Sequence, residues 1–309
     1  NIDGTLTAPI VIKPYKNDTV KFSGTKDINT NWSVYQGNIY KTQLSHHIWQ
    51  LFANDTMMMA ARWPNADNPW FENSNWWDRE STWAEVNSSS PQETIINKAS
   101  GLHSLSGTNK DFTGGVAIMN TCSFYTYQSV IEDHSIGANS FNYDNSKFYR
   151  YIESVYNQGI KHAWYYIEDD LDCLDSPGEW YYDKSTMELY LWPYNNQSPN
   201  NQNIKGKVQS FAFTFDKCDY IEIDGIEFHG TTIKFNNTKN VTIENCLFKY
   251  PSYSKRMLKN VSPINITEIT SVGNVNNHIF RNNVVEYTDG SALHFYLGEG
   301  VTIENNLFH

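Results

Sequence analysis

Four segments in the last third of the chain share one alternating pattern of apolar and polar residues. Two columns of apolar residues emerge when the segments are aligned: Ile223, Ile243, Phe280 and Ile303, and then Phe228, Phe248, Val285 and Phe308. The segments are "YIEIDGIEFHG" (220–230), "NVTIENCLFKY" (240–250), "HIFRNNVVEYT" (278–288) and "GVTIENNLFH" (300–309). Alternation with a period of two predicts a β-strand in each segment.

A third aligned column holds only Gly or Asn, namely Gly225, Asn245, Asn282 and Asn305. These residue types tolerate a bend or a left-handed backbone. A short bent strand that recurs every twenty or so residues is typical of a solenoid. We therefore expect coils stacked about 4.8 Å apart, in which like residues lie above one another and Asn amides hydrogen-bond along the axis.

The rest of the chain is less regular. Residues 7–25 predict two short strands around a turn, and residues 176–193 predict a hairpin. The Trp-rich part of residues 45–100 predicts an elaborated loop or cap. We expect a single domain, 1–309, with insertions and the hairpin in 45–200 and regular coils in 208–309. The absence of an initiator Met and the end within a repeat predict a processed piece.

The composition narrows the possible partners. A formal net charge of -11 disfavours nucleic acid and anionic membranes, and no apolar run is long enough to span a membrane. Four separated cysteines leave buried thiols and one or two disulfides both open. Nine Asn-X-Ser/Thr sequons, a small excess over chance, indicate a glycosylated exterior. Abundant Trp and Tyr suit either sugar stacking or core packing.

Several stretches together resemble a known superfamily. They are "PIVIKPYKNDTVKFSGT", "MMMAARWPN", "PGEWYYDKSTMELYLWP" and the "VTIENNLF" coils. They resemble right-handed parallel β-helix proteins of the pectate-lyase-like superfamily, in particular secreted bacterial polysaccharide lyases and glycoside hydrolases. The resemblance implies an all-β, right-handed parallel β-helix solenoid with an irregular Trp-rich region inserted in the N-terminal half. It also implies an extracellular or cell-surface location.

The superfamily includes lyases, hydrolases, epimerases, phage tailspikes and adhesins, so the resemblance leaves activity open. Its chondroitinase-B-like and alginate-lyase-like members use Lys and Arg on adjacent coils, often with calcium. That set has no residue-by-residue counterpart in this sequence. Its hydrolases use pairs or triplets of carboxylates on one face, an arrangement that can be sought here.

The residue that follows the second apolar column is titratable in all four aligned segments: His229, Lys249, Glu286 and His309. We name these four residues the titratable column. At a coil spacing of about 4.8 Å their charges would couple, and they could supply an acid, a base and a cation. Solvated residues on an exposed strand face are the alternative interpretation.

The stretch "EYTDGSALHF" (286–295) adds Asp289 and His294 to Glu286 as catalytic candidates. Cleavage of a glycosidic bond needs two carboxyl groups, one to protonate the leaving oxygen and one to attack or to activate water. The alternative is that "TDG" is only a turn.

Arg62 is a candidate for binding a substrate carboxylate or stacking on a sugar, and a buried structural arginine is the alternative. Trp76, Trp77 and Trp83 are candidates for a sugar-binding wall. The acidic stretch 167–179 predicts either a solvated turn or a calcium site, since hard oxygen ligands suit calcium. We therefore expect no cofactor, with calcium as the alternative.

Two functions follow from these patterns. The first is an extracellular carbohydrate-active enzyme, a lyase or a hydrolase, that cleaves a polysaccharide in a groove along the β-helix. The second is a non-catalytic structural or adhesive β-helix protein of a surface layer, filament or spike, which predicts an oligomer or filament.

Overall fold

A computed structural model describes residues 3–66, 78–91, 93–122, 125–144, 163–260, 267–271, 276–289, 291–296 and 299–309. The chain divides into two compact units. The first unit comprises Asn1–Asp27, Lys205–Ser254 and Ser262–His309, and the second comprises Ile28–Ile204 and Lys255–Val261. Within the described residues, no helix has the length and apolarity needed to cross a membrane.

The protein is all-β, and helical structure in the described ranges is confined to short turns. These are the α-helix α1 (Arg79–Thr82) and the 3-10 turns η1 (Leu171–Cys173), η2 (Pro199–Asn201) and η3 (Arg256–Leu258).

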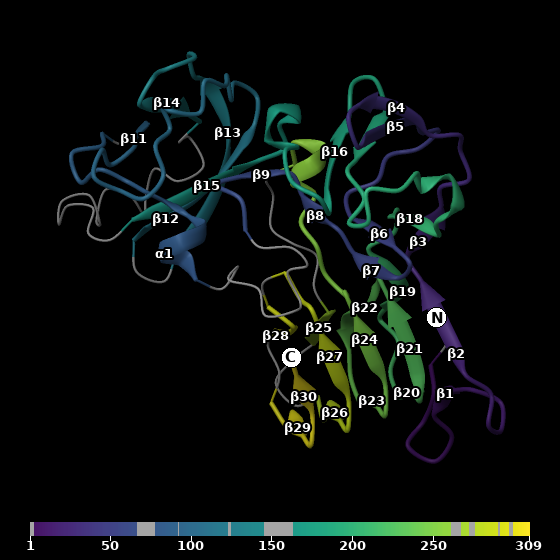
Figure 1. Cartoon of the computed structure of the whole chain (residues 1–309). Coiled ribbons are helices and arrows are strands. Elements are labelled where there is room, and N and C mark those ends of the chain that lie inside the picture. The colour runs from purple at the N-terminus through teal and green to yellow at the C-terminus, as the bar shows by residue number, and fades with distance from the viewer. Residues whose placement is uncertain are drawn as a thin grey trace. The chain divides into compact units, whose positions relative to one another are not determined.

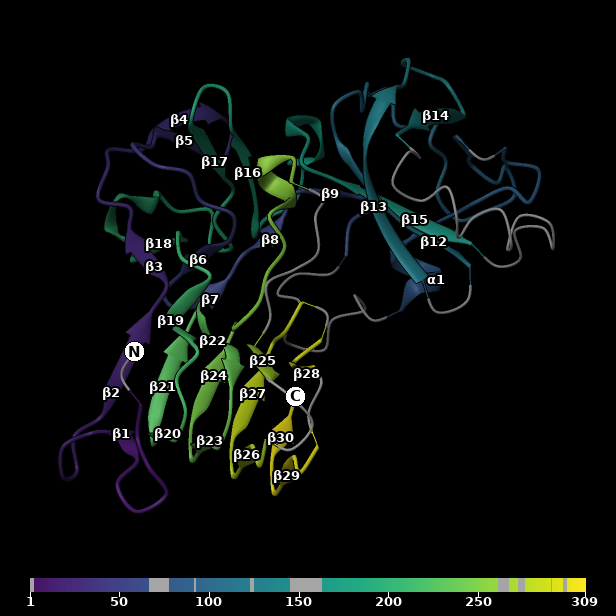
Figure 2. The same cartoon turned by 180° about the vertical axis from the view of Figure 1, so that it is seen from behind.

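The first unit contains three parallel sheets whose strands follow one another in the same chain order (Figures 1 and 2). Sheet one has β1 (Ile10–Ile12), β20 (Ile221–Asp224), β23 (Val241–Glu244), β26 (Ile279–Arg281) and β29 (Thr302–Glu304). Sheet two has β2 (Val20–Ser23), β21 (Ile226–His229), β24 (Leu247–Lys249), β27 (Val284–Glu286) and β30 (Leu307–Phe308). Sheet three has β19 (Phe211–Asp216), β22 (Thr232–Thr238), β25 (Thr267–Ser271) and β28 (Leu293–Tyr296).

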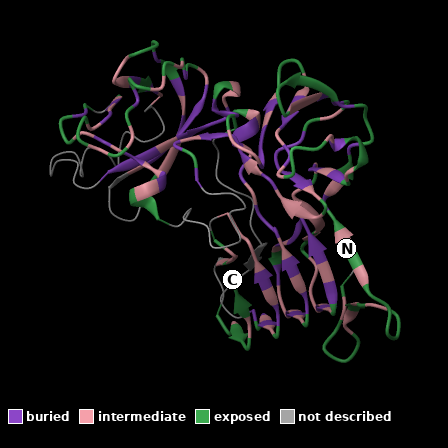
Figure 3. Ribbon diagram, viewed as in Figure 1, coloured by how far each residue is buried: buried purple, intermediate pink, exposed green. Residues whose placement is uncertain are grey.

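The predicted apolar columns are confirmed by the strand register. Ile223 pairs with Ile243, Ile243 with Phe280, and Phe280 with Ile303. Phe228 pairs with Phe248, Phe248 with Val285, and Val285 with Phe308. The rings of Phe228 and Phe248 stack with centroids 4.8 Å apart. All of these residues except Ile303 and Phe308 belong to the core of the unit, and the burial colours of Figure 3 alternate along its strands. Ile303 and Phe308, on the last strands of sheets one and two, are 52% and 46% exposed. The two predicted strands of residues 7–25 are β1 and β2, which extend sheets one and two.

The predicted left-handed column is also confirmed, because Gly225, Asn245, Asn282 and Asn305 all have φ between 54° and 70°. The amide ladder, however, is formed by the next residues along the chain. Asn306 donates to Phe280 O at 2.8 Å and Asn283 donates to Ile243 O at 3.0 Å. The prediction misplaced this ladder because the left-handed Asn residues are exposed, whereas the residue after each turns back toward the core.

The left-handed backbone gives a first testable result. Asn245→Ala is expected to lower the free energy of unfolding by about 1 kcal/mol, because a Cβ at positive φ is strained and Ala lacks the short amide that relieves it. The lost hydrogen bond from Asn245 to Asp224 (2.7 Å) acts in the same direction. Asn245→Gly is the matched control, since Gly225 already occupies this column. Urea unfolding followed by far-UV circular dichroism measures both variants, and equal midpoints for Ala and Gly would contradict the strain argument.

The second unit contains two larger sheets. A mixed five-stranded sheet has β4 (Ser33–Gln36), β5 (Ile39–Gln43), β17 (Glu188–Leu191), β16 (Glu179–Asp183) and β8 (Met59–Ala60). A seven-stranded sheet has β10 (Ala84–Glu85), β15 (Trp164–Glu168), β12 (Val116–Cys122), β13 (Tyr125–Asp133), β14 (Ser140–Tyr143), β11 (Thr94–Ile96) and β9 (Arg62–Trp63). The short strands β6 (Leu51–Ala53) and β7 (Thr56–Met57) pair with each other. In the first unit, β3 (Thr25–Asp27) pairs with β18 (Ile204–Lys207).

The predicted hairpin of residues 176–193 is confirmed as the antiparallel pair β16 and β17. The segment Lys255–Val261, between β24 and β25, belongs to the second unit. Cys173, Cys218 and Cys246 are free thiols. The prediction of a single domain with insertions in 45–200 stays a prediction.

Candidate functional site

The titratable column lies along sheet two of the first unit. His229, Lys249 and Glu286 are the last residues of the adjacent strands β21, β24 and β27, and the register pairs them in that order. His309 follows β30, and its N–H donates to Val285 O at 2.9 Å. The predicted alignment is therefore present in space, with side chains of different charge on neighbouring strands.

Two tyrosines cover this column. Tyr250 and Tyr287 follow Lys249 and Glu286, both have positive φ, and their rings stack with centroids 5.0 Å apart. The Lys249 Nζ lies 5.6 Å from each ring centroid, a geometry that stabilises the ammonium through cation–π contacts. His229 packs edge-on against Tyr250 at 5.6 Å and is only 4% exposed. The interpretation of the column as a solvated face is therefore wrong at His229, because the tyrosine that follows the next strand covers it.

One carboxyl group lies in this column, and a second follows it closely along the chain. Glu286 is half-buried, and no hydrogen bond or ion pair joins its carboxylate to another residue in the described ranges. Asp289 follows three residues later and accepts a hydrogen bond from Ser254 N–H at 3.0 Å. One carboxylate is thus held in place by the main chain, whereas the other is uncommitted and adjoins a cation.

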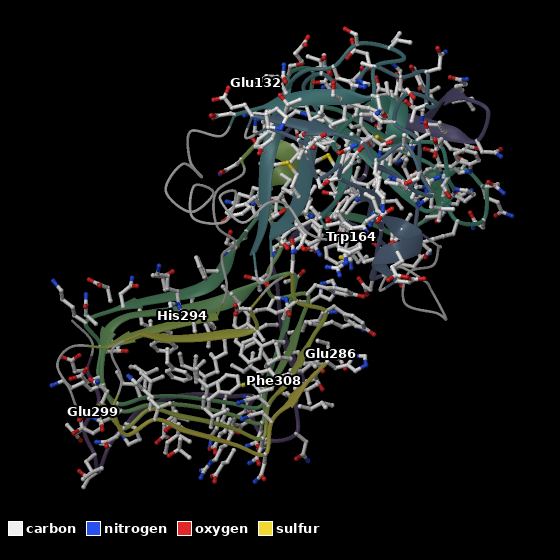
Figure 4. The ribbon with its side chains drawn as sticks, turned by 90° about the vertical axis from the view of Figure 1, so that its left-hand side faces the viewer. Glu132, Trp164, Glu286, His294, Glu299 and Phe308 are labelled. Carbon is white, nitrogen blue, oxygen red and sulfur yellow. The ribbon has the colours of Figure 1, made fainter. Side chains whose placement is uncertain are left out.

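His294 does not join this group. It lies on β28, in sheet three, at the register position opposite Glu268 of the neighbouring strand β25. Figure 4 shows His294 and Glu286 on different sheets of the unit. The two residues are only eight positions apart in sequence, but they belong to strands of different sheets, so proximity in sequence was misleading.

Arg62 is buried in the second unit, which favours the interpretation as a structural arginine over a role in substrate binding. Its side chain is 5% exposed, and it donates to Pro64 O at 2.9 Å and to Thr82 O at 2.5 Å. The guanidinium lies 3.9 Å from the Tyr166 ring centroid, and burial lowers the pKa of Arg62. The main-chain oxygens of Pro64 and Thr82 therefore accept from guanidinium N–H groups that a substrate would need.

The structure describes one of the three tryptophans that were predicted to form a sugar-binding wall. Trp83 is half-buried and packs edge-on against Tyr166, with centroids 4.5 Å apart. Trp76 and Trp77 lie outside the described residues.

The acidic stretch 167–179 is not simply a solvated turn. Glu168 pairs with Arg256 at 2.8 Å, and Asp169 pairs with Lys259 at 2.6 Å. Glu179 accepts from main-chain N–H groups that include Ser176 N at 3.1 Å, and burial raises its pKa to about 8. Burial also raises the pKa of Asp169 to about 8, although Lys259 opposes the shift.

The prediction failed at Glu168 and Asp169 because their partners Arg256 and Lys259 come from a distant segment with no recognisable pattern. As for the calcium alternative, no group of three or more His, Cys, Asp and Glu with metal-binding geometry occurs in the part of the chain that the structure describes.

The fold and the column define an all-β protein in which parallel sheets carry titratable residues in register. No family model matches the sequence, and no curated protein matches it. A solved structure titled "Glycoside hydrolase" has a similar fold, with a TM-score of 0.57, 12% identity, and coverage of 96% of this chain and 68% of that chain. A second, "The complex structure of XylC with xylose", gives a TM-score of 0.42 at 12% identity and covers 99% of this chain and 45% of that one. At such identity the first likeness concerns the fold alone.

Proposed function

We propose that this protein is an extracellular carbohydrate-active enzyme that cleaves a glycosidic bond of a polysaccharide on a right-handed parallel β-helix. The order of the strands supports such coils, because the chain passes through sheets one, two and three in turn at β20, β21 and β22. The fold likeness to a structure titled "Glycoside hydrolase" supports the activity. The sequons support the location.

The observation that carries the proposal is Glu286, which lies opposite Lys249 on the neighbouring strand, with Asp289 three residues further along the chain. Hydrolysis requires one carboxyl group as proton donor and a second as nucleophile or base. We assign the first role to the uncommitted Glu286 and the second to Asp289, which the Ser254 N–H orients. Lys249 then stabilises negative charge near the reacting bond. On a uronate-containing glycan, the same ammonium would neutralise the sugar carboxylate, and His309 would be the base of a lyase reaction.

A panel of glycans tests the proposal and separates the two reactions. The whole chain is incubated with uronate-containing polysaccharides and with neutral ones such as xylan. Ultraviolet absorbance of unsaturated ends reports a lyase, and reducing ends without that absorbance report a hydrolase. We expect new chain ends with at least one glycan. Silence with every glycan would overturn the enzyme proposal and favour the structural or adhesive alternative.

A further inference from the structure

A second arginine of the second unit stacks on the same strand as Arg62 but differs from it in exposure. Trp164, Tyr166 and Glu168 of β15 lie on one face of the seven-stranded sheet, because Tyr165 and Ile167 between them belong to the core. Arg62 covers Tyr166, and Arg79 covers Trp164 with its guanidinium carbon 4.0 Å from the ring centroid. Figure 4 shows Trp164 beside α1, the helix that begins with Arg79.

The two guanidinium groups have different partners. The donors of Arg62 reach main-chain carbonyl oxygens inside the unit, and its side chain is buried. Arg79 is exposed, and its one hydrogen bond to a described residue is long, from Nη1 to Asn120 Oδ1 at 3.4 Å. A guanidinium has five N–H donors in a rigid planar fork. Most of the donors of Arg79 are therefore available to a ligand, while the Trp164 ring fixes the plane of the fork.

Two carboxylates near Arg79 in the fold, those of Glu85 and Asp78, have other partners. Glu85 lies opposite Trp164 on β10, but it pairs with Lys98 at 2.8 Å. Asp78 caps α1 by accepting from Glu80 N–H at 3.1 Å. Within the described ranges no ion pair engages Arg79, although the chain as a whole carries a net charge of -11. An oriented, exposed cation without a counter-ion suits recognition of an external oxyanion.

The neighbours of Arg79 suit a sugar. Trp83 at the end of α1 is a half-buried aromatic residue that packs edge-on against Tyr166. Asn120 and the exposed Thr126 hydrogen-bond to each other at 3.1 Å and add an amide and a hydroxyl group. Sugar recognition combines an aromatic surface with a few polar groups that fix orientation.

We propose that this face of the second unit, the Arg79 face, binds an acidic glycan by pairing Arg79 with the oxyanion of the sugar, a uronate carboxylate or a sulfate ester. Binding at the Arg79 face does not depend on cleavage by the first unit. It would give the protein an affinity for charged polysaccharides whichever bond the proposed enzyme cleaves.

Calorimetric titration of the whole chain tests the site. Trigalacturonate is the uronate probe, its methyl ester is the uncharged control, and a sulfated trisaccharide is the sulfate probe. Titrations use the Glu286→Gln background, so that cleavage does not consume the ligand. We expect Arg79→Gln to weaken binding of the acidic probe about tenfold to a hundredfold, the effect of losing a charge-assisted hydrogen-bonded pair.

Arg79→Lys keeps the charge but loses the planar fork, so we expect an intermediate affinity. Arg281→Gln is the matched control, because it removes the same charge from an arginine that pairs with Glu244 at 2.7 Å in the first unit. Arg79-dependent binding of either acidic probe supports the proposal and identifies the oxyanion. The proposal is overturned if Arg79→Gln binds both probes as tightly as Arg281→Gln does, or if trigalacturonate binds and its methyl ester binds equally tightly.

Discussion

Glu286→Gln is expected to slow cleavage of the responsive glycan roughly 10²–10⁴-fold, the usual contribution of a positioned general acid or base. The amide cannot deliver a proton, so the rate should fall. Because the amide has nearly the shape of the carboxyl group, folding should be unaffected. Rates are compared at saturating glycan, and far-UV circular dichroism checks the fold.

Glu222→Gln provides the matched control for this experiment. Glu222 is also half-buried on a parallel strand of the first unit, but it lies in sheet one opposite Thr242. We expect the Glu222 variant to retain the wild-type rate. Equal rates for the two variants would remove Glu286 from the chemistry, whereas a slow Glu222 variant would show that the loss reflects charge or folding rather than a particular proton donor.

The parts of the fold that could be predicted are those in which stacking imposes repetition. Ile223 and Ile243 occupy equivalent positions in successive strands and meet the same neighbours, so selection for packing leaves like residues at like positions. The left-handed conformation of Asn245 was predictable for the same reason, since few residue types tolerate it. The alignment of Lys249 with Glu286 followed from the same register.

The parts that could not be predicted depend on contacts between segments with no shared pattern. The burial of His229 depends on the ring of Tyr250, which follows a different strand. The exposure of Arg79 and the burial of Arg62 depend on which carbonyl oxygens the fold brings to each of them. Neither arginine lies in a repeat, so periodicity carries no information about it.

The buried pair of Glu168 and Arg256 gives the largest expected effect on stability. Their side chains are 9% and 10% exposed, and Arg256 Nε donates to Glu168 Oε2 at 2.8 Å. Arg256→Met leaves a buried carboxylate without its main partner, and removal of one member of such a pair costs about 3–5 kcal/mol. Arg62 also interacts favourably with Glu168. Glu168 therefore keeps one of its two neighbouring cations in the Arg256→Met variant.

Tryptophan fluorescence during urea unfolding isolates this effect, because all ten tryptophans lie within residues 28–204 and therefore report on the second unit. Lys98→Met is the control within the same unit: Lys98 Nζ pairs with Glu85 Oε1 at 2.8 Å, but the side chains are 43% and 31% exposed, so no measurable change is expected. The double variant Arg256→Met with Glu168→Leu should regain much of the lost stability, since apolar residues can replace a buried ion pair at little cost. A double variant no more stable than Arg256→Met alone would contradict this explanation. The loss of stability would then come from the missing charged pair, which holds the segment Lys255–Val261 in the second unit, and not from an unpaired buried carboxylate.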